Sequence, residues 1–357
     1  MNDGRPVMIM AGGTGGHIFP GLAVAEVLAA RAVPVVWLGA TGALETRLVP
    51  ARGIRLLELP VRGVRGKDWQ ARLRAPWMLL TALRAAWAAL RRERPRSVLA
   101  LGGYVAGPGG LAAFLRRVPL VVHEQNAMPG MTNRVLARLA RRVLVGFPDA
   151  LPRAACSGNP VRAVIADLPA PAQRFAARTG RAHLLVLGGS QGARALNLGV
   201  PAALALLPAV ERPEVWHQCG AQGVEATRAA YAAAGIEARI EPFIDAMEQA
   251  YAWADLALCR AGALTLAELA ATGLGAILVP YPHAVDDHQT RNAAFMTGAG
   301  AARLLPESAL SAQTLVRELG MLLADRARLL GMATAARALA RPDAAVRIAD
   351  ACLEVAR

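Results

Sequence analysis

A short glycine-rich stretch near the amino terminus constrains the fold more than any other part of this sequence. Residues 12–20 read GGTGGHIFP, follow the apolar run 7–10 and precede a helical pattern that begins at Leu22. Closely spaced glycines let backbone N–H groups approach a bulky anion, and the positive end of the following helix points at the same place. The pattern predicts a strand, a glycine loop and a helix, with phosphate or pyrophosphate as the natural ligand. The alternative is a tight turn that binds nothing.

The loop departs from the dinucleotide-binding fingerprint in two places. That fingerprint needs a third glycine where Ile18 stands, and an acidic residue at the end of the next strand, where residues 38–41 read LGAT. Both are missing. The distinctive residue is His17, which brings an ionisable ring to the mouth of the loop.

Short apolar runs alternate with helical patterns along all 357 residues, which is typical of parallel sheets covered by helices on both faces. The spacing predicts one series of strands followed by a second, separated by the turn-rich segment 157–162. A final helix over 344–355 can pack on either domain. The predicted strands are residues 7–10, 33–38, 54–59, 98–101, 120–122 and 143–145, then 184–187, 215–217, 256–258 and 276–279.

The net positive charge is distributed unevenly along the chain. Residues 1–160 hold 22 basic and 8 acidic side chains, whereas residues 161–357 hold 18 of each. This excess predicts an anionic partner for the first half: nucleic acid, an acidic membrane surface or a polyanionic substrate. Recognisable nucleic-acid modules are missing from the basic half, so we expect no nucleic-acid partner.

A helical segment over 69–94 combines tryptophans with arginines and has two interpretations. It is either a helix packed on the sheet with its arginines in water, or a basic amphipathic surface resting on anionic lipid. The local excess of positive charge favours the lipid surface. The residues concerned are Trp69, Trp77, Trp87, Arg72, Arg74, Arg84, Arg91 and Arg92, with Arg116, Arg117, Arg138, Arg141 and Arg142 nearby.

Neither a membrane span nor a secretory signal is predicted. The uncharged segments 97–115 and 195–210 are interrupted by glycine and proline, and the amino terminus runs directly into the first strand. The four cysteines lie far apart, without metal-type spacing, so we expect neither a disulfide framework nor a zinc site. These features indicate a cytoplasmic protein.

Further polar and glycine-rich segments follow other predicted strands. Residues 102–110 form a second glycine-rich stretch that could bind another phosphate, and residues 123–126 (HEQN) are either ligand-binding or a buried hydrogen-bonding cluster. In the second half, the turn at 188–193 places the Ser190 hydroxyl beside a helix start.

Two more sets of polar side chains carry alternatives. Thr265 and Glu268 have the spacing of a helix capping box, but the carboxylate could instead accept both hydroxyls of a ribose. Gln289 and Asn292 share one helical face and could bind sugar hydroxyls, although an ordinary N-capped helix shows similar residues.

Taken together, eight segments in this order resemble the MurG family of bacterial UDP-N-acetylglucosamine transferases over nearly the whole chain. The family usually has serine at the position of Ala261, so one local hydrogen bond is in doubt. The segments are GGTGGHIFPGLAVAEVL (12–28), GGYVAGPGG (102–110), HEQNAMPGMTNR (123–134), GNPVR (158–162), LGGSQGA (187–193), PFIDAM (242–247), RAGALTLAEL (260–269) and DDHQTRNA (286–293).

The resemblance implies an α/β protein with two Rossmann-like domains facing across a cleft, the GT-B fold. Residues 1–160 would form the acceptor and membrane-facing domain, joined by the terminal helix 342–357, and residues 161–341 would bind UDP-N-acetylglucosamine. The acceptor would be undecaprenyl-pyrophosphoryl-N-acetylmuramyl pentapeptide (lipid I), converted to lipid II in peptidoglycan synthesis. The enzyme would lie peripherally on the cytoplasmic face of the cell membrane, with other cell-wall enzymes as possible partners.

By the same resemblance, His17 lies at the acceptor side. The residues that would hold the donor are Thr14, Gly15, Gly16, Asn126, Arg162, Ser190, Ile244, Ala263, Leu264, Thr265, Glu268 and Gln289. No aspartate pair follows a strand where a metal–diphosphate clamp would be expected, so we predict no metal ion and no cofactor. A UDP-N-acetylglucosamine 2-epimerase of the same fold is the alternative enzyme.

The predicted chemistry is inverting transfer to the muramyl 4-hydroxyl. Ser190 and Arg162 would stabilise the departing UDP, and the attacking hydroxyl would need a base. His17 is the candidate, because the positive end of a helix disfavours its charged form. In the alternative interpretation His17 only orders the loop or binds phosphate, and Glu124 is the reserve base.

Overall fold

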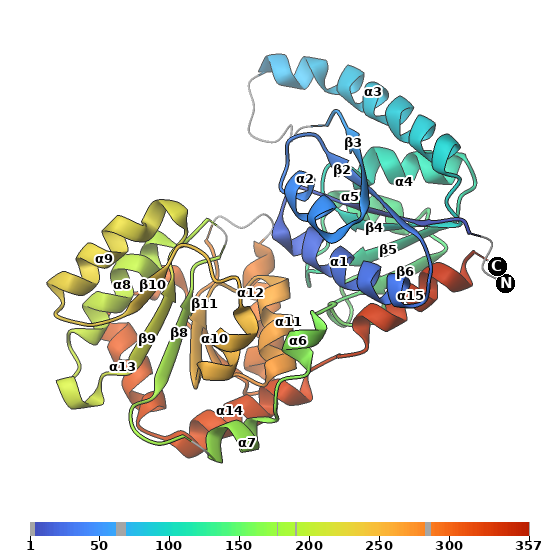
Figure 1. Ribbon diagram of the computed structural model, residues 1–357. Coiled ribbons are helices and arrows are strands. Elements are labelled where there is room, and N and C mark those ends of the chain that lie inside the picture. The colour runs from blue at the N-terminus through green and yellow to red at the C-terminus, as the bar shows by residue number, and fades with distance from the viewer. Residues whose placement is uncertain (1–3, 62–68, 177, 190, 283–286, 357) are drawn as a thin grey trace. The chain divides into compact units, whose positions relative to one another are not determined.

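The computed structural model describes residues 4–61, 69–176, 178–189, 191–282 and 287–356, with only the backbone described over 69–76 (Figure 1). The chain divides into two compact units. Unit 1 comprises Met1–Val161 and Arg341–Arg357, and unit 2 comprises Arg162–Ala340.

Unit 1 is built on a parallel sheet of seven strands in the order β3-β2-β1-β4-β5-β6-β7. Two glycine-bearing strand ends, those of β1 and β4, are neighbours in the middle of the sheet. The strands are β1 (Val7–Ala11), β2 (Val35–Ala40), β3 (Arg55–Leu59), β4 (Ser97–Gly102), β5 (Leu120–Glu124), β6 (Arg142–Val145) and β7 (Ala155–Cys156).

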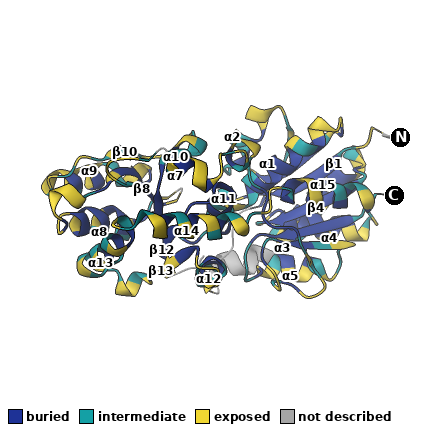
Figure 2. Cartoon of the chain, turned by 90° about the horizontal axis from the view of Figure 1, so that it is seen from below, coloured by how far each residue is buried: buried dark blue, intermediate teal, exposed yellow. Residues whose placement is uncertain are grey.

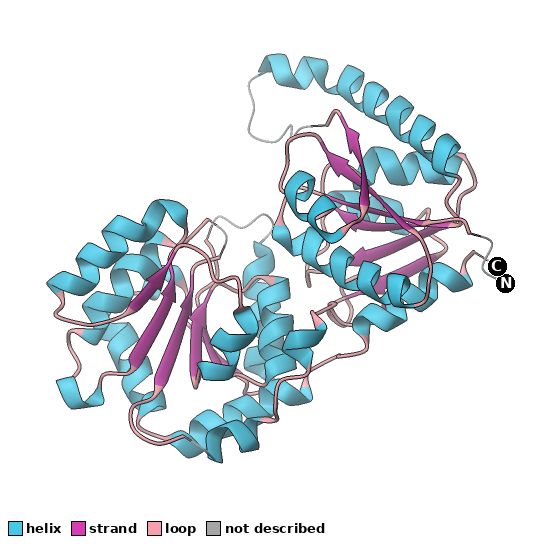
Figure 3. Cartoon of the chain, viewed as in Figure 1, coloured by secondary structure: helices cyan, strands magenta, loops and turns pink. Residues whose placement is uncertain are grey.

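Helices cover both faces of this sheet, as Figure 3 shows. Side chains alternate along β1, so that Val7 and Ile9 enter one core while Met8 and Met10 enter the other. The helices are α1 (Gly15–Ala30), α2 (Glu45–Leu48), α3 (Trp69–Glu93), α4 (Ala106–Leu115), α5 (Met131–Ala137) and the terminal α15 (Ala344–Glu354).

The terminal helix α15 packs in unit 1. Ile348 and Cys352 are fully buried in the core that also contains Ile9 of β1 and Leu28 of α1. More than 300 residues separate these partners along the chain. The residue pattern alone left the partner of this helix open, whereas the resemblance to the MurG family implied the first domain.

Unit 2 repeats the plan with a parallel six-stranded sheet in the order β10-β9-β8-β11-β12-β13. Its strands are β8 (His183–Leu187), β9 (Glu214–Gln218), β10 (Arg239–Glu241), β11 (Leu256–Cys259), β12 (Ala276–Leu278) and β13 (Ala302–Leu304). Its helices are α6 (Ala163–Ala166), α7 (Pro171–Ala176), α8 (Arg194–Leu204), α9 (Val224–Ala233), α10 (Met247–Trp253), α11 (Ala263–Thr272), α12 (His288–Gly298), α13 (Ala312–Leu323) and α14 (Arg326–Ala338).

Burial follows the predicted apolar runs. The central strands of both sheets are buried, while the outward faces of the helices are exposed (Figure 2). All ten predicted strands are confirmed, with shifts of one or two residues at their ends. The prediction missed β7, β10 and β13, which are two or three residues long and lie at sheet edges or start from polar residues. Such short strands lack enough residues to show a hydrophobic period.

Candidate active site

The carboxyl ends of β1, β4 and β5 bring their following loops together in unit 1. A side chain added at Gly102, the last residue of β4, would place its Cβ 3.0 Å from His17 Nε2 and 3.5 Å from Asn133 Nδ2. Asn133 Nδ2 in turn donates to Glu124 Oε2 at 2.9 Å. Two predicted residues, His17 and Glu124, therefore belong to one cluster, and Gly102 and Asn133 connect them.

The predicted strand, glycine loop and helix at residues 7–30 are confirmed. Thr14 is the N-cap of α1 in an extended conformation, and Gly15 and Gly16 are the first helical residues. Gly13 has a φ of +91°, which favours glycine. At Gly103, with a φ of +80°, a Cβ would overlap the Gly12 carbonyl oxygen. These close backbone contacts explain why the loops after β1 and β4 both use glycine.

His17 is held neutral in the loop. Its Nδ1 lies 3.2 Å from Thr14 Oγ1. Burial lowers the pKa of His17 to about 4, although a hydrogen bond to the Gly12 backbone acts in the opposite direction. The direction agrees with the prediction, but desolvation is the cause rather than the end of the helix. At pH 7 the imidazole is a proton acceptor.

Glu124 organises the loop that follows β5. Its Oε1 accepts from Asn126 N at 2.9 Å and Asn126 Nδ2 at 3.2 Å, and its Oε2 accepts from Gly130 N and from Asn133. Burial raises the pKa of this carboxyl, and the donated hydrogen bonds oppose the rise. This geometry supports a role in shaping the loop more directly than contact with substrate. The reserve-base role stays a prediction.

His123 belongs to the buried hydrogen-bonding cluster that was the alternative for this segment. Its Nε2 lies 3.0 Å from the Gly158 carbonyl oxygen, and Gln125 Nε2 lies 3.1 Å from its Nδ1. Burial lowers the pKa of His123 to about 4. His123 and Gln125 therefore stabilise the buried base of the loop that follows β5.

Residues 102–110 do not form one continuous loop, because α4 begins at Ala106, and phosphate binding by this segment stays a prediction. Gly107, Gly109 and Gly110 lie inside α4. A Cβ on Gly109 would overlap the Met10 sulfur, and a Cβ on Gly110 would lie 2.7 Å from Leu136 Cδ2. Gly109 thus allows α4 to pack closely on the sheet, and Gly110 allows it to pack closely on Leu136 of α5.

In unit 2, the glycine turn after β8 is held by Gln218 at the end of β9. Gly189 N donates to Gln218 Oε1 at 3.0 Å, and Gln218 Nε2 donates to the carbonyls of Gly189 and Pro242. Gly192 approaches the backbone of Cys219 too closely for any side chain. Ser190, predicted to bind the donor, lies outside the described residues.

Glu268 forms a polar cluster with two residues of the same unit. Tyr251 OH donates to Glu268 Oε2 at 2.8 Å, and Arg162 Nη2 lies 3.6 Å from Glu268 Oε1. Burial raises the pKa of Glu268, while Arg162 and the Tyr251 hydroxyl favour the ionised form. Burial and the neighbouring carboxylate raise the pKa of Tyr251 well above its usual value, so it remains a donor.

The capping-box alternative for Thr265 and Glu268 is wrong. The N-cap of α11 is Gly262, so Thr265 is the third helical residue and Glu268 lies in the middle of the helix. The first residues, Ala263, Leu264 and Thr265, present N–H groups that have no acceptor within the helix. They form a ready anion-binding terminus.

Gln289 and Asn292 both bind the backbone of Ala261. Gln289 Oε1 accepts from Ala261 N at 3.2 Å and from Tyr281 N at 3.0 Å, and Asn292 Nδ2 donates to the Ala261 carbonyl at 3.2 Å. The two side chains thus connect α12 to the loop before α11. Ile244, the remaining predicted donor contact, is buried in the turn after β10.

Besides Asn133, which donates to Glu124, three further polar residues of these sites were missed by the sequence prediction. Tyr251 bonds Glu268, Gln218 holds the second glycine turn, and Glu45 holds the first by accepting from Gly13 N at 3.1 Å. One weak signal could have indicated Glu45, namely that it is an acidic residue shortly after the second predicted strand. Among the described residues no group of three or more His, Cys, Asp or Glu is placed to hold a metal ion.

Comparison with known proteins covers almost the whole chain. Residues 7–145 match the glycosyltransferase family 28 N-terminal domain, and residues 183–348 match the glycosyltransferase family 28 C-terminal domain. The UDP-N-acetylglucosamine–N-acetylmuramyl-(pentapeptide) pyrophosphoryl-undecaprenol N-acetylglucosamine transferase of Xanthomonas campestris pv. campestris (strain B100) is 60% identical over 354 residues, which are 99% of this chain and 82% of that protein.

The same enzyme of Alkalilimnicola ehrlichii is 58% identical over 99% of both chains. The crystal structure of Acinetobacter baumannii MurG has a TM-score of 0.84 and 39% identity, covering 98% of this chain and 99% of that one. The two parallel sheets are those of the GT-B fold, as the sequence predicted. The chain belongs to glycosyltransferase family 28 and, within it, to the MurG family.

Proposed function

We propose that this protein transfers N-acetylglucosamine from UDP-N-acetylglucosamine to the 4-hydroxyl of undecaprenyl-pyrophosphoryl-N-acetylmuramyl pentapeptide, with inversion at the anomeric carbon. Family membership supports the assignment of these substrates, because the names of two relatives state this transferase activity. The observation that carries the chemistry is the neutral imidazole of His17, which is held at the end of a strand beside a glycine loop.

The donor is assigned to unit 2. Its uridine would lie against Ile244, and its ribose would hydrogen-bond Glu268, which Tyr251 and Arg162 hold in place. The N–H groups of Ala263, Leu264 and Thr265 would face the diphosphate, together with the glycine turn that contains Ser190. Gln289 would contact the sugar. Thr14, Gly15, Gly16 and Asn126 of unit 1 complete the proposed donor contacts.

His17 would then take the proton from the attacking hydroxyl. The hydrogen bond to the Gly12 backbone needs a ring N–H, so one ring nitrogen carries a proton and the other has the lone pair that would accept the hydroxyl proton. Nε2 lies so close to Gly102 that a Cβ at this position would press on the ring. As the new glycosidic bond forms, the bond to UDP breaks, and Arg162 would stabilise the negative charge that develops on the diphosphate.

Release of UDP with and without acceptor tests this function. We expect UDP release from UDP-N-acetylglucosamine to require a lipid-linked muramyl pentapeptide analogue, with a β-linked disaccharide as product. A 2-epimerase would consume the sugar nucleotide without any acceptor, and that result would overturn the proposal.

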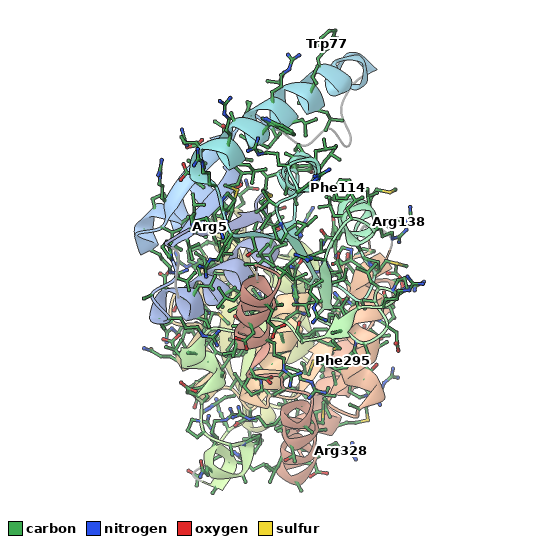
Figure 4. All side chains as sticks on the ribbon, turned by 90° about the vertical axis from the view of Figure 1, so that its right-hand side faces the viewer. Arg5, Trp77, Phe114, Arg138, Phe295 and Arg328 are labelled. Atoms are coloured by element: carbon green, nitrogen blue, oxygen red, sulfur yellow. The ribbon has the colours of Figure 1, made fainter. Side chains whose placement is uncertain are left out.

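We further propose that unit 1 docks on the cytoplasmic leaflet through α3 and α4. Within the described residues, no helix has the length and apolarity to cross a bilayer. The buried face of α3 carries Ala82, Ala86 and Leu90, but its other face exposes Trp77, which is 72% accessible. Figure 4 labels Trp77 near the end of α3 and Phe114 on α4. The exposed apolar residues here are Trp77, Leu79, Leu80, Trp87, Leu111, Phe114 and Leu115.

Arginines border this apolar surface. The Arg116 guanidinium lies 4.9 Å from the centre of the Trp87 ring, and Arg84 and Arg91 are exposed on α3. Each basic residue near an anionic bilayer contributes about 1 kcal/mol, and the attraction falls off within a Debye length. The side chains of Trp69, Arg72 and Arg74, which the prediction included, lie outside the described residues.

Vesicle binding is therefore expected to require anionic lipid and to weaken with salt. Flotation with phosphatidylcholine vesicles, with and without phosphatidylglycerol, measures this dependence. Trp77→Ala should weaken binding, whereas Val210→Ala, at an exposed apolar residue of unit 2, should not. Equal binding to neutral and anionic vesicles would contradict the proposal.

A further inference from the structure

The carboxylate of Glu45 lies buried beneath the first glycine loop. Its Oε2 accepts from Gly13 N at 3.1 Å, and its Oε1 accepts from Ala40 N at 2.8 Å. The residue is fully buried. Both oxygens act as acceptors, as they do in an ionised carboxylate, and hydrogen bonds to a charged acceptor are stronger than neutral ones. Glu45 thus ties the loop after β1 to the end of β2.

Two glycines make room for this side chain. A Cβ on Gly12 would overlap Glu45 Oε1, and a Cβ on Gly39 would lie 2.6 Å from Glu45 Cγ. Neither glycine has a positive φ, so neither is required by backbone conformation. Their small size is explained by the space that the Glu45 side chain occupies.

The second glycine loop is held by an uncharged residue. β2 lies beside β1 as β9 lies beside β8. Glu45 begins α2 shortly after β2, and Gln218 is the last residue of β9, so each side chain reaches its glycine loop from the neighbouring strand or the segment that follows it. Gln218 accepts from Gly189 N and donates to the Gly189 carbonyl. The first loop is therefore held by a carboxylate, and the second by a neutral amide.

This difference changes what each loop can bind. A phosphate at Gly13 N would compete with Glu45 for the same N–H and would meet a buried negative charge. The amide of Gln218 presents no such charge to a diphosphate. The phosphate-binding role that the glycine pattern predicts for the first loop is therefore disfavoured at Gly13.

We infer that Glu45 is a positioning residue: its carboxylate occupies the Gly13 N–H in place of a phosphate and fixes the loop so that His17 faces the acceptor hydroxyl. The role of His17 rests on the function proposed above. Glu45 itself acts through the loop and touches no substrate.

The test compares Glu45→Gln, Gly12→Ala and the double variant in the full-length protein. Glu45→Gln keeps the shape but places an NH2 group against one of the two N–H donors, and Gly12→Ala pushes the carboxylate away without removing its charge. Each single change is expected to lower kcat by at least about tenfold, since small misplacements of reacting groups are costly. The KM for the lipid acceptor should stay within about twofold.

The double variant should resemble the single ones, because both changes displace the same carboxylate. Gln218→Ala is the matched control and should raise the KM for UDP-N-acetylglucosamine, since it loosens the loop of unit 2. Fully additive losses of kcat, an unchanged kcat, or a raised KM for the lipid acceptor at unchanged kcat would each overturn the inference. The last result would make the loop a phosphate site.

Hydrogen exchange separates this inference from the proposed function. In Glu45→Gln, the peptide that spans residues 11–17 should exchange faster than in the wild type, whatever the reaction. Unchanged exchange would refute the positioning role even if transfer is confirmed. Faster exchange in a protein without transferase activity would refute only the proposed function.

Discussion

Replacing His17 by alanine is expected to lower the turnover number by about 10²–10⁴-fold, the usual contribution of a general base. Affinity for UDP-N-acetylglucosamine should remain nearly unchanged, because His17 is assigned to the acceptor and most of the proposed donor contacts belong to unit 2. The physical basis is the neutral ring, whose pKa burial lowers to about 4. Steady-state kinetics and donor titration calorimetry measure the two quantities separately.

His17→Gln distinguishes a base from a loop-ordering residue. Glutamine can keep a hydrogen bond to Thr14 Oγ1 but cannot accept a proton at pH 7. If His17 is the base, the turnover number should therefore fall by a similar factor in both variants. Recovery of wild-type turnover in His17→Gln, or a loss of donor binding in proportion to the rate, would refute the assignment.

The pH profile gives an independent check on His17. The ring works only when neutral, so activity should be lost as pH falls through the lowered pKa of about 4 rather than through 6.5. The acid limb of kcat/KM reports this value in the free enzyme. In the wild type, kcat/KM should therefore stay level between pH 6 and 7. A fall centred near 6.5 would show an exposed, unperturbed imidazole.

Glu268→Gln is expected to weaken donor binding by about 1.5–3 kcal/mol, or roughly 10- to 150-fold in Kd, the range for a hydrogen bond to a charged group. The variant keeps the size of the side chain but loses a charged acceptor for the ribose hydroxyls. Because Glu268 does not cap α11, loss of helix capping does not enter this result. Titration of UDP into the wild type and the variant measures the change.

A nucleotide without the 2′-hydroxyl isolates the ribose contact. The wild type should bind UDP more tightly than 2′-deoxy-UDP, and Glu268→Gln should lose most of that preference. Tyr251→Phe is the matched control, since it removes the hydroxyl that bonds Glu268 Oε2 but keeps the carboxylate. Equal preference for UDP in the wild type and Glu268→Gln would show that Glu268 only supports Arg162 and Tyr251.

Local patterns were enough for much of the fold. The ten strands were predicted because each contains a short run of apolar residues, which is fully buried in central strands such as β1 and β4. The strand, glycine loop and helix around His17 follow from residues within one short segment. The same patterns indicated Glu268 and Gln289 as candidate site residues on helices. They also offered a capping box at Thr265 and Glu268 as an alternative, which is wrong because the capping-box spacing cannot show where a helix begins.

The sequence by itself determined the alternation of strands and helices, the glycine loops and the family, since these depend on neighbouring residues and on motif order. Only the tertiary structure decided which distant side chains complete them. Glu45 reaches Gly13 across 32 residues, Tyr251 reaches Glu268 from a different helix, and α15 packs against α1 from the opposite end of the chain. Polar partners meet because the carboxyl ends of parallel strands lie at the same edge of a sheet, and helices meet because their apolar faces pack on the same face of the sheet. Neither kind of contact between distant residues produces a periodic pattern in the sequence.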